Sequence, residues 1–564
     1  MTIRNFLSYT GIFTYPIFAW LFWYILEAFE TMGVEFLAYP VVRILIIYVL
    51  PIIFPLIVTT TNMERQKRGQ TDFSFSEVYG LGNKDPKHSK EYIEAAYPDV
   101  PKEYSSKAPK DLVFGKHKGK YVICPIKKDG INVFCVGTPG SGKSVLLLGW
   151  LYSMMHREEI AKKGRTEVGK KYNFFLVDIK GELFERLLQI KAKDYDVRKY
   201  QELKVVAPSN RQSYGYDVFY RIHKEHVSET EYIKAITDIV DALVMEAGNT
   251  DSPYFTENAK KMLAGFLYYY SKQGDEFVTI IKKIMRTSLT KLLQEVLKGA
   301  MEQRMMFVID KLATFAGKEG NESIQDVEST LQMYLSVFSY PDVEYCLKDN
   351  PNRTSPADLR DGVTSIDLSV EESMLSTYEP IFRLICMQML KECEEFKEDD
   401  NRYTCLIFDE AARIGKIKGL DAAMSTLRSK HVTLITLFQS LSQFRDIYPN
   451  ETAKTLLNLC ETKIFLSGAD KETADYVGAI AGDYEATKMS YKKNGFWGGK
   501  SDGNYSTERR PIVDTKEMMG LRERGEAIVF IYGHYCRCKK LRYFEDPYIA
   551  PILKRKQKEK TKAT

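Results

Sequence analysis

The chain has 564 residues, of which 44% are hydrophobic and 27% are charged. This length is too great for one hydrophobic core, so we expect two or three domains. Lys and Arg (80) nearly balance Asp and Glu (75), so any basic surface must be local. The nine cysteines include no C-x-x-C pair, which argues against a zinc site or a disulfide framework and favours a reducing cytoplasm for most of the chain.

The N-terminal region is apolar. Phe6 to Phe29 and Phe36 to Val58 are each long enough to cross a bilayer. Arg4 precedes the first run and basic residues from Arg65 follow the second, so we predict a hairpin of two transmembrane helices with both ends cytoplasmic. Arg43, inside the second run, either snorkels to the membrane surface or contacts another membrane subunit.

The stretch from Ile131 to Trp150 contains G-x-x-x-x-G-K-S, the pattern of a phosphate-binding P-loop (Walker A). An apolar strand precedes the glycines and an apolar helix follows Ser144, as this motif requires. The predicted nucleotide-binding residues are Gly137, Thr138, Pro139, Gly140, Ser141, Gly142, Lys143 and Ser144. Lys143 is expected to reach the β- and γ-phosphates, and the Ser144 hydroxyl to bind magnesium.

After the P-loop helix, the apolar strand NFFLVD ends at Asp178 and is followed by Lys180. Both residues would lie at the same sheet edge as the P-loop, although an ordinary strand-to-helix turn explains the pattern equally well. Between about Val227 and Asp342 the pattern changes to helical runs, and strand patterns resume only at Gly362 to Leu368. We therefore predict an all-alpha domain inserted into the nucleotide-binding fold.

A second nucleotide motif lies downstream of this insertion. Tyr403 to Glu410 reads YTCLIFDE, an apolar strand that ends in two acids, as in a Walker B motif. Asp409 is predicted to hold the magnesium shell, and Glu410 to polarise the water that attacks the γ-phosphate.

Two further residues follow Walker B. A predicted helix over Leu420 to Lys430 carries Arg428, and a strand over Val432 to Phe438 ends at Gln439. Gln439, at the tip of the strand beside Walker B, either orients the attacking water or is a solvated turn residue.

The C-terminal region offers weaker signals. The segment from Asp483 to Arg510 interleaves Tyr, Phe and Trp with Lys, and two interpretations remain: a loop that stacks on single-stranded bases, or a disordered surface loop, which we favour. The basic tail after Lys554 is read as solvated.

Several stretches resemble the type IV coupling proteins, the TraG/TraD-like ATPases of conjugation and type IV secretion, over nearly the whole chain. These stretches are GTPGSGKS, DIKGEL, FDEAARIG, LFQSLSQF and RRPIVDTKEMMGLRERGEAIVFIYG. Ala411 stands where that family usually has an aromatic residue, and Ile179 where it usually has proline. Neither departure removes a phosphate-binding or metal-binding group.

The resemblance implies a homohexamer in the bacterial plasma (inner) membrane, with most of the chain cytoplasmic and RecA-like domains that hydrolyse ATP with Mg²⁺. It implies that the inserted domain recognises a relaxase–DNA complex, in which the DNA is single-stranded, or effector proteins, and delivers them to the type IV secretion channel. Residues that fall on the family's nucleotide motifs are Lys143, Ser144, Asp409, Glu410 and Gln439. Arg428 falls where the family has an arginine finger, and the alternative is an intrasubunit salt bridge to an acid such as Asp421 or Glu410.

Two other functions compete with this one. An FtsK/HerA-like double-stranded DNA pump shares the Walker pair but lacks a long helical insertion between the two motifs. A membrane-tethered receptor that docks substrates without hydrolysis would not need the Glu410 base. ATP is preferred over GTP because the chain has no N-K-x-D guanine signature.

The predicted fold class is α/β: a RecA-like P-loop domain with an inserted all-alpha domain, preceded by two transmembrane helices. The predicted parts are a membrane anchor (1–62), a cytoplasmic linker (63–110), the first part of the nucleotide-binding domain (111–227), the all-alpha insertion (228–345), the second part of the nucleotide-binding domain (346–550) and a basic tail (551–564).

Overall fold

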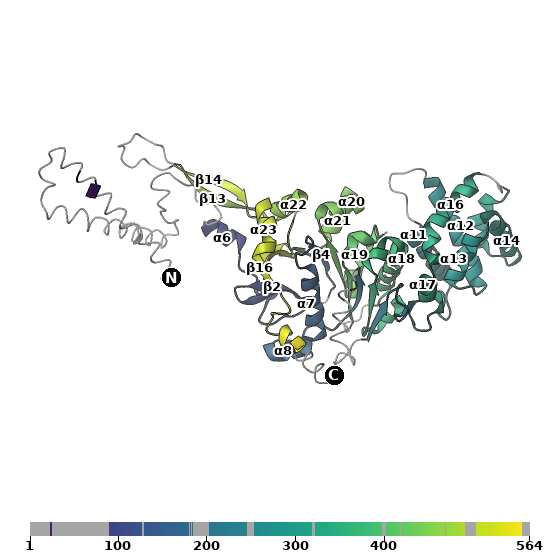
Figure 1. Cartoon of the computed structure of the whole chain (residues 1–564), viewed down its shortest axis with the longest axis horizontal. Helices are drawn as coiled ribbons and strands as arrows, with labels where there is room; N and C mark the ends of the chain where they lie inside the picture. Colours follow the sequence, from purple (N-terminus) through teal and green to yellow (C-terminus); the bar gives the residue numbers. More distant parts are fainter. Residues whose placement is uncertain are drawn as a thin grey trace. The chain divides into compact units, whose positions relative to one another are not determined.

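The computed structural model describes residues 23–24, 27, 90–126, 129–179, 181, 183, 202–244, 253–317, 322–397, 402–417, 419–468, 470–490 and 504–554 (Figure 1). The chain forms two compact units. One comprises Met1–Tyr97 with Ala481–Ile512, and the other Pro98–Ile480 with Val513–Thr564.

The larger unit is built on a 12-stranded sheet with the order β1-β3-β2-β16-β15-β12-β4-β11-β10-β5-β9-β6. Neighbours from β12 to β6 are parallel, and neighbours from β1 to β12 are antiparallel, so the sheet is mixed. The strands are β1 (Ser105–Ser106), β2 (Leu112–His117), β3 (Lys120–Cys124), β4 (Asn132–Val136), β5 (Tyr172–Asp178), β6 (Glu202–Val206), β9 (Thr364–Ser369), β10 (Tyr403–Phe408), β11 (Val432–Phe438), β12 (Thr462–Phe465), β15 (Glu526–Ile531) and β16 (His534–Lys540).

The central strands are mostly apolar because helices cover both of their faces. Every residue of β4, β5, β10 and β11 is buried. The helices of this unit outside the insertion are α7 (Lys143–Met155), α8 (Arg157–Gly164), α18 (Leu375–Glu394), α19 (Leu420–Thr426), α20 (Leu441–Ile447), α21 (Asn450–Asn458), α22 (Lys471–Ala481) and α23 (Thr515–Arg524). Trp150 fixes α7 against the sheet, since it is fully buried and its indole N–H donates to the Val113 carbonyl at 2.7 Å.

The predicted helical insertion is present as a run of helices between β7 (Gly215–Tyr216) and β8 (Arg353–Thr354), two short strands that pair in parallel at its base. It consists of α11 (Glu229–Leu243), α12 (Pro253–Lys272), α13 (Phe277–Arg286), α14 (Leu289–Glu302), α15 (Met306–Leu312), η6 (Ala313–Phe315), α16 (Glu322–Leu335), η7 (Ser336–Ser339), α17 (Pro341–Glu344) and η8 (Tyr345–Asp349), grouped together in Figure 1. Ser228 begins α11 with a capping box to Glu231, which satisfies the first backbone N–H groups.

Some helices and strands differ from those that the sequence patterns predict. The helical pattern between Phe277 and Lys298, which reads as one run in the sequence, is divided into two helices because Thr287 takes an extended conformation between α13 and α14. The short strands β6, β7 and β8 were not anticipated, since five or fewer residues carry little periodicity.

The smaller unit corrects the expectation of a disordered loop over Asp483 to Arg510. There, β13 (Asp483–Ser490) and β14 (Asn504–Pro511) form an antiparallel hairpin, and α6 (Lys90–Ala96) packs on it. Tyr484 and Ala486 alternate with exposed residues, as in a half-buried strand, and Tyr484 contacts Tyr92 with ring centroids 5.3 Å apart. The aromatic and basic residues between 491 and 503 lie outside the described residues.

The predicted transmembrane hairpin also falls almost entirely outside the described residues, as does Arg43. Among the helices that the structure describes, none combines the length and the apolarity that a membrane span requires.

Candidate nucleotide-binding site

Parallel strands bring the predicted motifs to one edge of the sheet. β4, β11, β10 and β5 are consecutive neighbours, and their carboxyl ends coincide because Val136 pairs with Phe438, and Phe408 with both Thr436 and Val177. The residues that follow these strands are Gly137, Gln439, Asp409 and, as the last residue of β5, Asp178. Ligands bind at this edge in open α/β sheets.

The P-loop backbone fits a polyphosphate. Gly140 and Gly142 have φ angles of +72° and +100°, a conformation that glycine adopts without strain. A Cβ atom at Gly137 would lie 2.4 Å from the Ser141 hydroxyl oxygen, so glycine is required there as well. That hydroxyl is buried and has no hydrogen-bond partner among the described residues. The loop can therefore turn its N–H groups toward an anion at the start of α7.

Lys143 and Ser144 occupy the first turn of α7. The Lys143 side chain is buried, and its ammonium donates to the Gly137 carbonyl at 2.5 Å, across the mouth of the loop. A cation held there is within reach of phosphates cradled by the loop. Ser144 is half-buried, and its hydroxyl is available to a metal ion at the loop.

The Walker B acids are also at this edge. Asp409 and Glu410 are 6% and 8% exposed, and Glu410 has a φ of +52°, which turns the chain sharply after β10. The Nε atom of Arg413, in η11 (Ala411–Ile414), lies 3.0 Å from the Glu410 carboxylate, and its Nη2 atom lies 3.0 Å from Glu372. Arg413 thus fixes the direction of the Glu410 carboxylate. The sequence analysis missed this residue, although its position three residues after the acid could have drawn attention to it.

Gln439 is half-buried, and its backbone N–H donates to the Gln443 side chain at 3.2 Å. Because Gly137 N–H donates to the Phe438 carbonyl at 3.1 Å, Gln439 directly adjoins the P-loop. The strand order β4-β11-β10 also confirms that the Gln439 strand lies beside Walker B.

Asp178 lies beside a second buried acid that the sequence analysis did not identify. Asp367 on β9 is fully buried, and neither of its carboxylate oxygens has a hydrogen-bond partner among the described residues. Burial, reinforced by the negative charge of Asp178, raises the pKa of Asp367 well above its usual value. Asp367 sits inside a sequence of ordinary strand character, so only the fold reveals its surroundings. Lys180 lies outside the described residues.

Arg428 is the one predicted site residue at the other edge of the sheet. It lies in η12 (Leu427–Lys430), and its carbonyl accepts from Gly130 N–H at 2.9 Å, just before β4 begins. Its guanidinium pairs with Glu461 at 2.5 Å rather than with Asp421 or Glu410, and it remains 38% exposed. The P-loop follows the opposite end of β4, so Arg428 is separated from its own subunit's phosphate loop.

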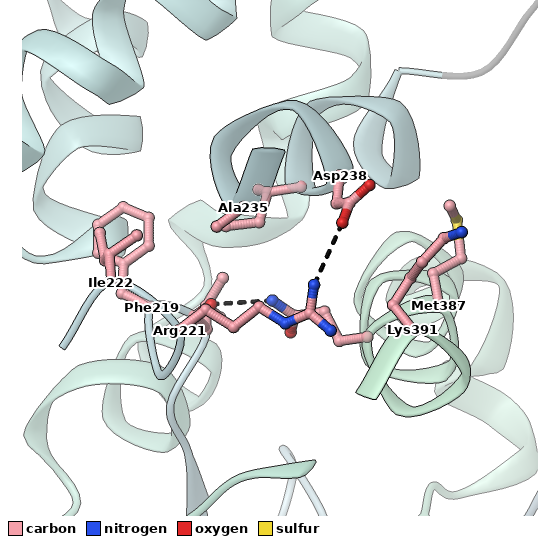
Figure 2. Close-up of a pocket in the computed structure, with 10 residues that line it drawn as sticks. Phe219, Arg221, Ile222, Ala235, Asp238, Met387 and Lys391 are labelled. Atoms are coloured by element: carbon pink, nitrogen blue, oxygen red, sulfur yellow. Dashed lines mark hydrogen bonds and ion pairs between the residues drawn. The ribbon is translucent and has the colours of Figure 1, made fainter. Parts of the chain in front are cut away.

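A separate group of charged residues lies at the root of the insertion (Figure 2). Arg221 pairs with Asp238 on α11 at 3.3 Å, as Figure 2 shows. It also pairs with Glu392 on α18 at 3.4 Å. Glu392 is fully buried and also accepts hydrogen bonds from Tyr220, at 3.0 Å, and from Arg360. Burial alone would raise the pKa of Glu392, but Arg360 and the other cations lower it below its usual value. We call this group the root cluster.

With this geometry established, comparison with known proteins identifies the family. The model of the family described as "Type IV secretory system Conjugative DNA transfer" matches residues 168–564. The chain belongs to this family. The match includes Walker B, Arg428, Gln439 and the helical insertion, and it begins after the P-loop.

Curated relatives have related descriptions. The conjugal transfer protein TraG of Rhizobium radiobacter is 27% identical over 231 residues, which are 40% of this chain and 35% of TraG. The type IV secretion system-coupling protein VirD4 of Bartonella quintana is 22% identical over 52% of this chain and 47% of VirD4. The chain thus spans less than half the length of these relatives.

Solved structures show the same fold. The bacterial conjugative coupling protein TrwB, without its first 70 residues, has a TM-score of 0.57 at 17% identity and covers 79% of this chain and 92% of the TrwB chain. TrwB in complex with ADP and Mg²⁺ has a TM-score of 0.55 at 18% identity, with 79% and 91% covered. The α/β nucleotide-binding fold predicted from the sequence is confirmed.

Proposed function

We propose that this protein is an ATP-hydrolysing coupling protein that supplies DNA or a relaxase–DNA complex, and also protein substrates, to a type IV secretion channel. The observation that carries this proposal is the shared edge of β4, β10 and β11, where the P-loop, the Walker B acids and Gln439 meet. Membership in the conjugative DNA transfer family supports the choice of DNA.

Each residue at the edge has a distinct role in this reaction. Lys143 neutralises charge on the β- and γ-phosphates of the substrate, and Gln439 orients the attacking water. Glu410, directed by Arg413, accepts a proton from that water. Ser144 and Asp409 would hold Mg²⁺, which supplies further charge neutralisation when bound.

Arg428 acts on the nucleotide of a neighbouring subunit in a homohexamer. Its distance from its own P-loop, at the opposite end of β4, supports this role, because a guanidinium there cannot serve its own site. Such a finger couples hydrolysis to assembly, since an isolated subunit lacks a group that the transition state needs.

The other parts of the chain anchor it in the membrane and select its cargo. Residues 1–62 anchor the chain in the bacterial plasma membrane through two transmembrane helices, with the bulk of the chain cytoplasmic. The insertion from 228 to 345 selects the cargo, because it carries none of the phosphate-binding or metal-binding groups. Exchanging it with a relative's insertion should redirect transfer in a mating assay. If the protein with the exchanged insertion still transferred the original cargo, the insertion would not be the part that selects the cargo.

The proposed activity is tested on the purified full chain. It should hydrolyse ATP only with Mg²⁺, and single- or double-stranded DNA should raise the rate. Lys143→Ala should abolish turnover, since the variant lacks the cation at the mouth of the loop. A wild-type chain that assembled on DNA and left ATP intact would contradict the proposal.

A further inference from the structure

Arg522, on α23, is a cation directed at the P-loop from the C-terminal part of the chain. A Cβ atom built on Gly140 would lie 2.8 Å from its Nη2 atom, so the guanidinium lies directly against the loop at Gly140. Arg522 is exposed, and the described residues supply no hydrogen bond or ion pair to its guanidinium.

Lys540, at the end of β16, reaches the same loop. Its ammonium donates to the Ser141 carbonyl at 2.9 Å and to the Leu466 carbonyl at 2.8 Å. Burial lowers the pKa of Lys540 to about 8; the thiols of Cys135 and Cys538 oppose this shift, and the charges of Arg522 and Arg542 add to it. Two like charges thus lie near each other beside the loop, and within the part of the chain that the structure describes no carboxylate forms an ion pair with Lys540.

Three other cations of this segment are neutralised by carboxylates. Arg537 and Arg524 both pair with Glu517 and Glu526, and Lys539 pairs with Glu526, at distances of 2.7–3.2 Å. Among the described residues, neither Arg522 nor Lys540 is paired with a carboxylate. An anion in the loop would relieve their mutual repulsion.

We propose that Arg522 binds the polyphosphate of the nucleotide held by the P-loop of its own subunit, and that Lys540 is a positioning residue that fixes the loop's backbone. The inference rests on the proposed nucleotide site and adds a cation to it that neither Walker motif contains. With carbonyl oxygens of Ser141 and Leu466 engaged by Lys540, the loop's N–H groups stay directed at the phosphates.

The test is the affinity of the purified full chain for fluorescently labelled ADP with Mg²⁺, measured by anisotropy at pH 7. Arg522→Gln should weaken ADP binding about tenfold or more, because a charge-assisted contact with phosphate is lost. Arg522→Lys should recover part of the affinity. Lys516→Gln removes an exposed cation from another face of the same helix and should leave the affinity unchanged.

Three results would overturn the proposal in different ways. If Arg522→Gln still binds ADP with wild-type affinity but Lys143→Ala does not, Arg522 does not bind the nucleotide, and the proposed nucleotide site itself stands. Binding that survives both substitutions would overturn the nucleotide site itself. Unchanged ADP affinity with weaker binding of a labelled single-stranded oligonucleotide would assign Arg522 to DNA.

Lys540 is tested by the pH profile of the same binding. A bound polyphosphate favours the protonated ammonium, so wild-type affinity should fall as the pH rises from 7 through about 8 to 9.5. Lys540→Met should bind ADP more weakly at pH 7, and its ADP affinity should not show the wild-type fall as the pH rises through about 8. A variant that kept the wild-type pH slope would contradict the positioning role, since a merely structural defect would leave the slope unchanged.

Discussion

The root cluster differs from the nucleotide edge, by which we mean the P-loop and the carboxyl ends of β4, β11, β10 and β5. Among the described residues, the buried Glu392 of the root cluster meets opposite charges, whereas some charged or acidic groups at the nucleotide edge do not. At the root, Glu392 is fully buried and is met by Arg221, Arg360 and Tyr220. At the nucleotide edge, Arg522 and Lys540 face the P-loop without a carboxylate, and Asp367 has no hydrogen-bond partner among the described residues. A charge network whose members are all paired within the chain holds two parts of the fold together, whereas unpaired charges around a loop mark a place where a ligand completes the network.

The largest expected effect is at Arg428. Its guanidinium pairs with Glu461 of the same chain, whereas the nucleotide on which we propose that it acts is bound by the neighbouring subunit. Arg428→Ala and Glu410→Gln should each abolish ATP hydrolysis. Mixed in equal amounts at ring-forming concentrations, they should regain activity at about a quarter of the sites, those that pair an intact Glu410 with a neighbour's intact Arg428. ATPase assays on the mixture measure this recovery.

Rings of the mixed subunits must be shown to assemble, by light scattering or electron microscopy. If the mixed rings assemble but stay inactive, Arg428 does not act on the neighbouring subunit's nucleotide, and its only role is the structural ion pair with Glu461.

Removing Glu392 from the root cluster should lower the stability of the fold and leave catalysis unaffected. Glu392→Ala leaves Arg221 and Arg360 without their buried partner, so the free energy of unfolding should fall by about 3–5 kcal/mol. Urea unfolding measures this change, while ADP affinity of the folded variant should match wild type.

The matched control is Glu394→Ala on the same helix, which removes a half-buried pair with Lys391 at 3.0 Å. It should cost about 0–1 kcal/mol. Equal losses in the two variants would mean that the root cluster contributes no more than an ordinary surface pair.

A smaller effect is expected at Asp367. Because its folded-state pKa is raised, the folded chain holds a proton that the unfolded chain releases, and stability should fall as the pH rises from about 4 to 7. Asp367→Asn cannot titrate, so its unfolding free energy should fall less over this window. Urea unfolding at several pH values checks the difference, and identical pH slopes would show that Asp367 titrates normally.

Local motifs made the nucleotide site predictable from the sequence. The glycines of the P-loop and the acids after an apolar strand each lie within a few neighbouring residues, and the parallel strands that align them leave clear apolar runs. Ser141 and Lys540 are 399 residues apart, and Asp367 belongs to no recognisable pattern. Arg522 lies in a stretch that resembles the family, but that stretch does not indicate which part of the chain Arg522 contacts. Only the folded sheet brings these residues to the site. The same holds for the partner of Arg428, since Glu461 follows a helix with no motif of its own.

The most direct test of the central claim is a comparison of ATP binding and turnover by Glu410→Gln. We expect this variant to bind labelled ATP with Mg²⁺ as tightly as wild type but to release no phosphate, because its loop and cations are intact and only the proton acceptor is lost. Phosphate release at the wild-type rate would contradict the assignment of Glu410, and with it the claim that the edge of β4, β10 and β11 hydrolyses ATP.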